Sequence, residues 1–196
     1  MPTLLRLPNL SDPRLAAYAN MRDAELAQRR DPLDAAAHAG LFVAEGELVL
    51  RRLIDSGFPV QSVLLAENRA KGLAGDLARL PEETPVYVLP QSHFNDIVGF
   101  NMHRGVLAIG RRTAPPPLAD VLRGGGPILI LEDLVNHDNL GGIFRNAAGL
   151  GGAGCGVVLS PRCADPLYRK SLRVSMGHVL TVPFTRVERW PGALDE

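Results

Sequence analysis

The chain has 196 residues, which is enough for one large domain or two small ones with real hydrophobic cores. Hydrophobic residues make up 46% of it and charged residues 21%, a globular composition that excludes a largely disordered chain. The 21 basic and 21 acidic residues cancel, so no overall field attracts nucleic acid, and any RNA contact must come from local arginine clusters.

The two cysteines, Cys155 and Cys163, have a spacing that matches no common metal site, and we expect unpaired thiols and no metal. The N-terminal residues do not form a basic leader followed by an apolar core. No apolar run approaches the roughly 18 residues of a membrane span. The sequence therefore predicts a cytoplasmic protein without an export signal or a membrane segment.

The first helix is predicted to begin at Ser11 or Asp12, with Pro13 in its first turn, and to continue through the charged run RDAELAQRRD. The arginines of this run either form a solvated face or touch RNA: Arg22, Arg29 and Arg30.

From residue 41 onward, short apolar strands alternate with helical segments, which predicts a compact α/β domain. The expected strands are residues 41–46, 60–66, 85–89 and 105–112, and the expected helices are residues 46–57, 68–80 and 91–99.

Basic side chains bracket the last of these strands. Arg104 precedes it, and Arg111 and Arg112 end it, so all three are candidates for contacts with RNA phosphates. Arginines at strand ends are also ordinary solubilising residues, and the sequence leaves both interpretations open.

A segment rich in proline and glycine, residues 113–126, follows this domain. Its triple proline is stiff and its triple glycine is loose, with one or two helical turns expected between them. We expect it to be a linker between an N-terminal domain, residues 1–112, and a second domain, residues 127–196.

The second domain begins with strand, polar turn, helix and strand. The apolar run at residues 127–133 is typical of a strand buried on both faces, and further strands are expected at residues 154–161 and 179–184. Open α/β sheets place their chemistry at the carboxyl ends of such strands, so the turn at residues 134–138 is where we expect a site.

The helix expected at residues 139–149 has an unusual composition. Its apolar stripe, formed by Leu140, Ile143, Phe144 and Ala147, lies nearly opposite Arg145. The positions three and four residues from Arg145 are occupied by Gly141, Gly142, Ala148 and Gly149. Glycine costs a helix roughly 1 kcal/mol relative to alanine, so three of them indicate the close approach of a backbone, a subunit or a ligand. The alternative is that Gly141 and Gly142 loosen the first turn, Gly149 belongs to the C-cap, and Arg145 is a solvated surface charge.

Two other patterns suggest ligands less specifically. Three acids around the end of the first strand fit either an acid–base or metal site, or a polar turn that caps a helix: Glu132, Asp133 and Asp138. Three glycines satisfy the dinucleotide fingerprint but are expected to close a helix and enter a strand, which excludes dinucleotide binding: Gly149, Gly151 and Gly154.

Two ordered motifs resemble those of the SpoU-type RNA 2′-O-ribose methyltransferases of the knotted SPOUT superfamily. The first is N-x-G-x-I-x-R-[TN]-A, matched by Asn139, Gly141, Ile143, Arg145, Asn146 and Ala147. The second is the segment from Ala164 to Phe184, which is similar to the family's D-P-x-x-x-K-x-x-R-x-S-x-G stretch.

The N-terminal domain resembles the small ribosomal-protein-like substrate-binding domain that precedes the methyltransferase domain in many SpoU-type enzymes. Residues 42–49 and 100–109 carry this likeness, with Arg104 where relatives usually have glutamine. The resemblance thus implies an α/β substrate-binding domain followed by a SPOUT methyltransferase domain.

The resemblance also implies a reaction, the transfer of a methyl group from S-adenosylmethionine to a ribose 2′-hydroxyl of RNA. It implies that Arg145 lies beside this hydroxyl and that Asn139 positions it. An arginine is a poor base because a guanidinium keeps its proton near neutral pH, so we expect Arg145 to orient the hydroxyl and stabilise charge, with direct proton abstraction left open.

Two later motifs of the family, a Glu-Gly turn and an asparagine-containing threading segment, have no counterpart here. We therefore expect an incomplete methyltransferase domain that is inactive alone and does not bind S-adenosylmethionine, while the full-length protein is an active homodimer. The alternative is a non-catalytic RNA-binding module with a degenerate methyltransferase domain. Ribosomal RNA is the first substrate choice and transfer RNA the second; neither DNA nor membrane is expected as a partner.

Overall fold

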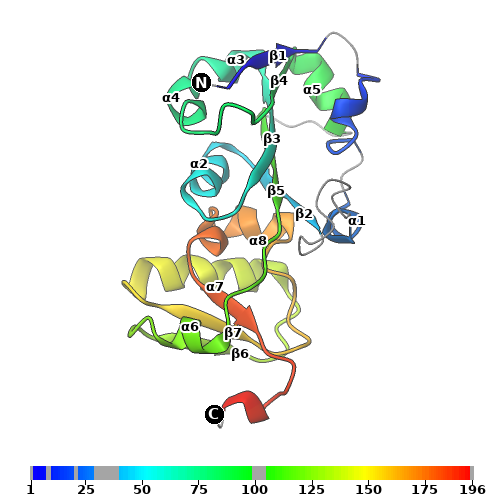
Figure 1. The fold of residues 1–196 in the computed structure, drawn as a ribbon. Helices are drawn as coiled ribbons and strands as arrows, with labels where there is room; N and C mark the ends of the chain where they lie inside the picture. Colours follow the sequence, from blue (N-terminus) through cyan, green and yellow to red (C-terminus); the bar gives the residue numbers. More distant parts are fainter. Residues whose placement is uncertain (1, 8–9, 20–21, 29–39, 99–104, 195–196) are drawn as a thin grey trace. The chain divides into compact units, whose positions relative to one another are not determined.

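The computed structural model describes the chain except for residues 1, 8–9, 20–21, 29–39, 99–104 and 195–196 (Figure 1). Two compact units divide it, Met1–Thr113 and Ala114–Glu196. None of the helices described is both long and apolar enough to cross a membrane.

The first unit is built on a five-stranded mixed sheet with the order β1-β4-β3-β5-β2. Its strands are β1 (Leu4–Arg6), β2 (Leu41–Glu45), β3 (Val60–Ala66), β4 (Val86–Leu89) and β5 (Val106–Arg111). β4 pairs in parallel with β1 and β3, whereas β5 runs antiparallel to β2 and β3. Because β5 lies between two strands, all but its last residue are buried.

Short helices connect these strands: α1 (Asp23–Gln28), α2 (Glu47–Asp55), α3 (Glu67–Ala70), α4 (Ala74–Leu77) and α5 (Gln91–Val98). In the core, the Tyr18 hydroxyl lies 2.6 Å from the Ser62 hydroxyl, and the ring of Tyr18 meets that of Tyr87 edge-on. The alternation of strands and helices predicted from residue 41 onward is therefore confirmed.

Two expectations for the first unit were wrong in detail. The N-terminal helix is a single 3-10 turn at Pro13–Leu15 capped by Asp12, with α1 as a separate helix. The helix expected at residues 68–80 divides into α3 and α4 around Gly72, whose backbone freedom favours a turn. Arg29 and Arg30 lie outside the described residues.

The second unit holds a three-stranded sheet, β6-β7-β8, formed by β6 (Ile128–Leu131), β7 (Gly156–Leu159) and β8 (Phe184–Arg186). All pairs are parallel, so the three strands end at the same edge of the sheet. This confirms the α/β class with a parallel sheet in the second half of the chain.

Helices cover both faces of this sheet (Figure 1). On one face lies α7 (His137–Leu150), where Phe144 meets Phe184 edge-on with ring centroids 5.5 Å apart. α8 (Arg169–Val174) and a 3-10 turn at His178–Leu180 pack against α7. On the other face α6 (Leu118–Leu122) places Val121 against Val158 and Val187.

Two strand predictions need correction. β6 is not buried on both faces, since it pairs only with β7 among the described residues and Ile130 is 51% exposed. The strand expected at residues 179–184 begins only at Phe184. Gly177, at φ 82°, turns the chain into a 3-10 helix in which the Leu180 N–H donates to the Gly177 carbonyl.

The proline- and glycine-rich segment divides differently from the expected linker at residues 113–126. The boundary between the units falls after Thr113, and the rest of the segment belongs to the second unit. The reason is α6, whose Val121 is buried in that unit's core.

α7 and α8 approach most closely at Gly141, where an added Cβ atom would lie 2.7 Å from the Ser171 carbonyl oxygen. A Cβ at the next residue, Gly142, would meet nothing within 4 Å. We expect Gly141→Ala to destabilise the protein by about 1–3 kcal/mol through overpacking and Gly142→Ala to stabilise it by about 0.5–1 kcal/mol. Urea unfolding midpoints measure both, and equal midpoints for the two variants would contradict this packing.

Candidate functional site

The first turn of α7 is fixed by Asn136. Its side-chain oxygen accepts hydrogen bonds from the Asp138 and Asn139 N–H groups at 2.9 and 3.0 Å. Asn136 has extended backbone angles, as an N-cap residue should. The cap is thus an asparagine and none of the three nearby acids.

The faces of α7 follow the predicted pattern. Leu140, Phe144 and Ala147 are buried, and Ile143 is half-buried. Asn139 and Arg145 are exposed. The predicted close approach at Gly141 is that of another backbone, the α8 carbonyl of Ser171.

Arg145 is exposed on α7 and has two glycines beside it on the helix. Among the residues that the structure describes, none forms a hydrogen bond or ion pair with its side chain, and Cβ atoms placed on Gly142 and Gly149 would meet nothing within 4 Å. A ligand could therefore reach both the guanidinium of Arg145 and the helix surface beside it.

Asn139 and Arg145 do not share one side of α7. Six residues at 3.6 per turn separate them by about 120° around the axis and about 9 Å along it. The two residues lie at opposite edges of an exposed strip of the helix and do not contact each other.

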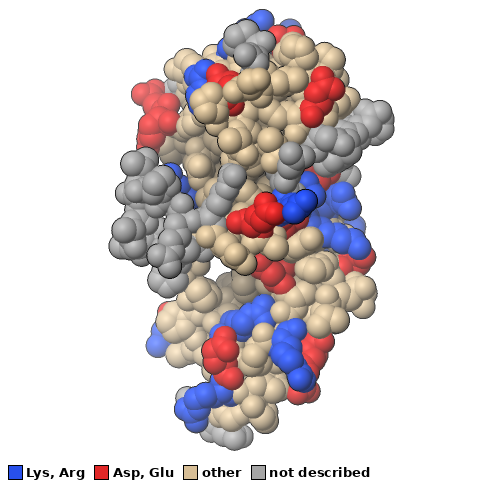
Figure 2. Space-filling model, turned by 90° about the vertical axis from the view of Figure 1, so that its right-hand side faces the viewer, with Lys and Arg blue, Asp and Glu red and all other residues tan. Residues whose placement is uncertain are grey.

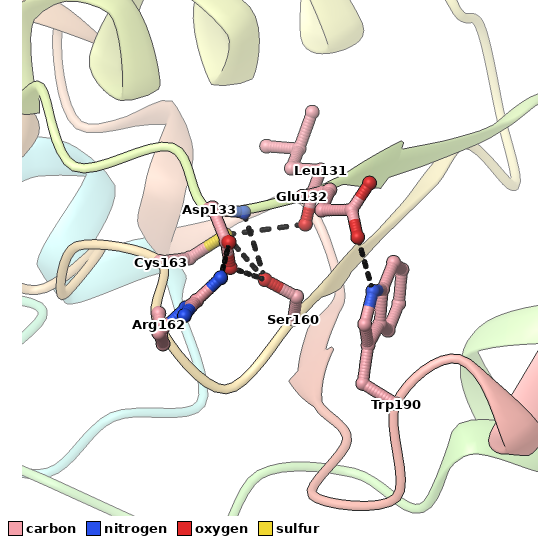
Figure 3. Close-up of polar contacts among 7 residues, drawn as sticks. All are labelled: Leu131, Glu132, Asp133, Ser160, Arg162, Cys163 and Trp190. Carbon is pink, nitrogen blue, oxygen red and sulfur yellow. Dashed lines mark hydrogen bonds and ion pairs between the residues drawn. The ribbon is translucent and has the colours of Figure 1, made fainter.

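A polar cluster joins the carboxyl ends of β6 and β7 (Figure 3). The Asp133 N–H donates to the Ser160 hydroxyl at 2.8 Å, and this hydroxyl donates to the Asp133 carboxylate at 3.0 Å. Arg162 binds the other carboxylate oxygen of Asp133. Asp133 has a φ of 50°, a left-handed conformation that is uncommon for a residue other than glycine, and this cluster holds it.

The neighbouring acids also have partners. The Trp190 indole N–H donates to the Glu132 carboxylate at 2.7 Å (Figure 3), and Lys170 forms an ion pair with Asp138 at 2.6 Å. Over the described part of the chain, no group of three or more histidine, cysteine or acidic residues is arranged to hold a metal ion. The acids therefore hold turns and helices together.

Both cysteines are unpaired and buried, and Cys163 donates through its thiol to the Leu131 carbonyl at 3.1 Å. The segment Ser175 to Gly177 ends α8, where the Gly177 N–H donates to the Leu172 carbonyl at 2.8 Å. Gly149 lies inside α7 and Gly154 precedes β7, so the glycine series closes a helix and leads into a strand, contrary to a dinucleotide site.

The candidate RNA-binding residues of the first unit lie at the end of β5. The Arg111 N–H donates to the Pro59 carbonyl at 2.9 Å, and the Arg112 guanidinium donates to the Leu41 carbonyl at 3.3 Å. Both side chains are half-buried, and Arg104 lies outside the described residues. A role of these arginines in RNA binding stays a prediction.

The sequence interpretation missed three residues that shape this region: Ser160, Arg162 and Arg186. The guanidinium of Arg186 donates to four carbonyl oxygens in the loop after β7. All three residues end a strand or follow one closely, so polar residues at the ends of parallel strands were the available signal.

S-adenosylmethionine would need partners for its sulfonium, amino and ribose groups. The acids that follow β6 are already bonded, Glu132 to Trp190, Asp133 to Arg162 and Asp138 to Lys170. A cofactor site that used these three acids would therefore have to share or replace their present contacts.

The bond from Arg162 holds the pKa of Asp133 below its ordinary value, with Ser160 adding to the effect. Because the folded-state pKa is depressed, the stabilisation is complete above the unfolded carboxyl pKa of about 3.9 and is lost as the pH falls through the lower folded value. We expect the difference in Tm between the wild type and Arg162→Gln to be small, since Arg162 is 81% exposed, and to decrease in acid. Thermal unfolding at pH 7 and pH 2.5 in low salt measures it, and an undiminished difference in acid would refute the pairing.

Residues 126–196 match the model of the SpoU rRNA Methylase family. The chain is 38% identical over 193 residues to an uncharacterized tRNA/rRNA methyltransferase of Mycobacterium bovis, which covers 98% of this chain and 65% of that protein. The chain thus spans about two thirds of the length of its mycobacterial relatives.

Solved structures share the fold. The AdoMet-bound rRNA methyltransferase from Sinorhizobium meliloti superposes with a TM-score of 0.67 at 20% identity, over 93% of this chain and 64% of that one. The SpoU methyltransferase AviRb from Streptomyces viridochromogenes, in complex with AdoMet, gives 0.68 at 21% identity, over 94% and 65%. The match of residues 126–196, the mycobacterial relatives and this shared fold agree that the chain is similar to proteins of the SpoU methylase family.

Proposed function

We propose that the protein of which this chain forms at least a part is an S-adenosylmethionine-dependent RNA methyltransferase that modifies a ribose 2′-hydroxyl. The family match and the tRNA/rRNA methyltransferase relatives support RNA as the substrate, and the AdoMet-bound neighbours support the methyl donor. Ribosomal RNA is our first choice of substrate and transfer RNA the second. We further propose that the protein acts as a homodimer in the cytoplasm.

One observation carries this proposal, the exposed Arg145 that no described residue binds. Arginine side chains on protein surfaces commonly pair with acids, as Arg123 does with Asp120 in the same unit. Arg145 instead points from a helix that is anchored on its other side by Leu140 and Phe144. A rigid helix that presents an unpaired guanidinium in open space suits an anionic substrate such as RNA.

Methyl transfer to a hydroxyl is an in-line displacement, so alignment of the two reactants provides much of the catalysis. A guanidinium stays protonated near neutral pH and therefore donates hydrogen bonds to the acceptor oxygen and a nearby phosphate. As the hydroxyl gives up its proton to solvent water, the fixed positive charge of Arg145 stabilises the negative charge that develops on the attacking oxygen. Asn139 offers an amide at the other end of the exposed strip, where it can position the ribose.

RNA binding is shared, in this proposal, with the first unit. Arg111 and Arg112 supply positive charge at the end of β5, and Arg104 adds to it from the segment before that strand. Such phosphate contacts position the RNA without selecting a sequence. A requirement for the 2′-hydroxyl would separate RNA from DNA.

We expect Arg145→Ala in the full-length protein to lower the turnover of methyl transfer by about 100-fold to 1,000-fold, since a charge-stabilising donor is lost. RNA affinity should change by less than about threefold, because only one phosphate contact is removed. Transfer of a labelled methyl group and filter binding measure the two effects. Arg123→Ala, which removes an exposed arginine paired with Asp120, is the matched control and should retain full turnover.

Retention of turnover by Arg145→Ala would refute the role of this arginine. Failure of the wild-type protein to methylate any RNA, with RNA binding intact, would instead favour a non-catalytic RNA-binding module.

The open space at Gly149 provides a steric test. Side chains on a helix lean toward its N-terminus, so a side chain at position 149 covers the surface next to Arg145. Gly149→Ala and Gly149→Leu should both fold, because an added Cβ meets nothing within 4 Å. We expect Gly149→Ala to stay within about threefold of wild-type turnover and Gly149→Leu to lose about 10-fold or more by blocking the RNA. Equal activity of the two variants would show that RNA does not approach this face.

A further inference from the structure

One arginine side chain donates hydrogen bonds to four backbone carbonyl oxygens of a single loop. Arg186 is the last residue of β8. Its Nη1 donates to the carbonyl oxygens of Ser160, Pro161 and Cys163 at 3.1, 2.7 and 2.8 Å. Its Nη2 donates to that of Ala164 at 3.1 Å.

Such convergence requires the loop to be curled around the guanidinium. Surface loops ordinarily leave their carbonyl oxygens to water. Arginine offers five N–H groups in a planar arrangement, whereas lysine offers three from a single nitrogen. Loss of Arg186 would therefore leave several carbonyl groups without their partner and release the shape of residues 160–164.

The loop held by Arg186 in turn holds the segment before α7. The Ala164 N–H donates to the Leu134 carbonyl at 2.8 Å, and the Ser160 N–H donates to the Leu131 carbonyl at 2.9 Å. The buried Ser160 hydroxyl also bonds to Asp133, as Figure 3 shows. The turn that leads to the Asn136 cap of α7 is therefore attached to this loop at three positions.

A second connection runs through α8. The loop continues through Asp165 into α8, where Ser171 meets α7 twice. Its carbonyl oxygen faces Gly141, and its hydroxyl donates to the His137 carbonyl at 3.3 Å. The first turns of α7 are therefore supported by the segment before the helix and by α8, and both of these are connected to the loop held by Arg186.

We propose that Arg186 is a positioning residue for the methyl transfer, which fixes Asn139 and Arg145 through the loop at residues 160–164. This inference rests on the proposed function for its kinetic consequence. It makes no claim of contact between Arg186 and the RNA. The guanidinium acts by holding the β7–α8 loop in one conformation, which in turn sets the position of α7.

The kinetic test compares Arg186→Gln, Arg186→Lys and the control Arg123→Gln in the full-length protein. We expect kcat to fall by about 10-fold to 100-fold in Arg186→Gln and by less in Arg186→Lys, with KM for RNA within about threefold, because misplacement of aligned groups affects turnover more than binding. Arg123→Gln should match the wild type. If folded Arg186→Gln keeps the wild-type kcat, the inference is wrong.

Hydrogen exchange followed by mass spectrometry, without RNA, decides the structural part independently. We expect amides of residues 137–145 and 160–168 to exchange faster in Arg186→Gln, while those of β7 and of the first unit keep their wild-type rates. A uniform increase over the whole second unit would mean that Arg186 only stabilises the fold, and this would overturn the proposal.

The two measurements separate the possible failures. If the wild-type protein shows no methyl transfer, the proposed function fails, and local exchange in α7 still decides whether Arg186 positions that helix. If Arg186→Gln does not fold, the same comparison with Arg186→Lys decides, since its ammonium keeps the charge and three donors. Unchanged exchange and unchanged kcat in that variant would then refute the inference.

Discussion

The close packing of α7 on α8 at Gly141 is the constraint on which the second unit depends. A carbonyl oxygen of α8 lies only 2.7 Å from where a Cβ atom on Gly141 would be, so no side chain fits at this position without a shift of one helix. This contact fixes which residues face the sheet, with Leu140 and Phe144 buried. It therefore also fixes the direction of Arg145. The glycine costs the helix roughly 1 kcal/mol of intrinsic propensity, which the close packing offsets.

The carboxyl edge of the parallel sheet serves a different purpose from the metal or acid–base site that its acids suggest. Asp133, Ser160 and Arg162 bind one another, and Glu132 binds Trp190. These contacts hold the two turns that leave β6 and β7. A reaction that depends on aligned reactants benefits from such supports, and in the proposed function the exposed Arg145 of α7 is the charged group that they position.

The sequence predicted the features that neighbouring residues determine, and it failed for features that depend on residues far away in the chain. The buried stripe and exposed arginine of α7 follow from helical periodicity, which is a local property, and they were confirmed. The exposure of Ile130 depends on whether β6 has a second neighbour, which an apolar run cannot reveal. The late start of β8 at Phe184 depends on the backbone turn at Gly177, which looked like part of a helix end only.

Long-range side-chain contacts were the least predictable part of the site. The sequence pattern did not single out Arg186, because its four carbonyl partners come together only when the β7–α8 loop folds around it. Asn139 and Arg145 lie about 120° apart around α7, and their expected roles at the ribose hydroxyl stay predictions. The roles of Arg104, Arg111 and Arg112 in RNA binding stay predictions.

The single tryptophan of the chain gives the second unit a built-in optical reporter. Trp190 packs beside the cluster of Val121, Val158 and Val187, and its indole is tied to the end of β6. Its emission spectrum therefore reads the integrity of this sheet edge alone, because the first unit contributes only tyrosine and phenylalanine fluorescence. Excitation at the red edge of the absorption band, where only tryptophan absorbs, would therefore report on the second unit without fluorescence from the first.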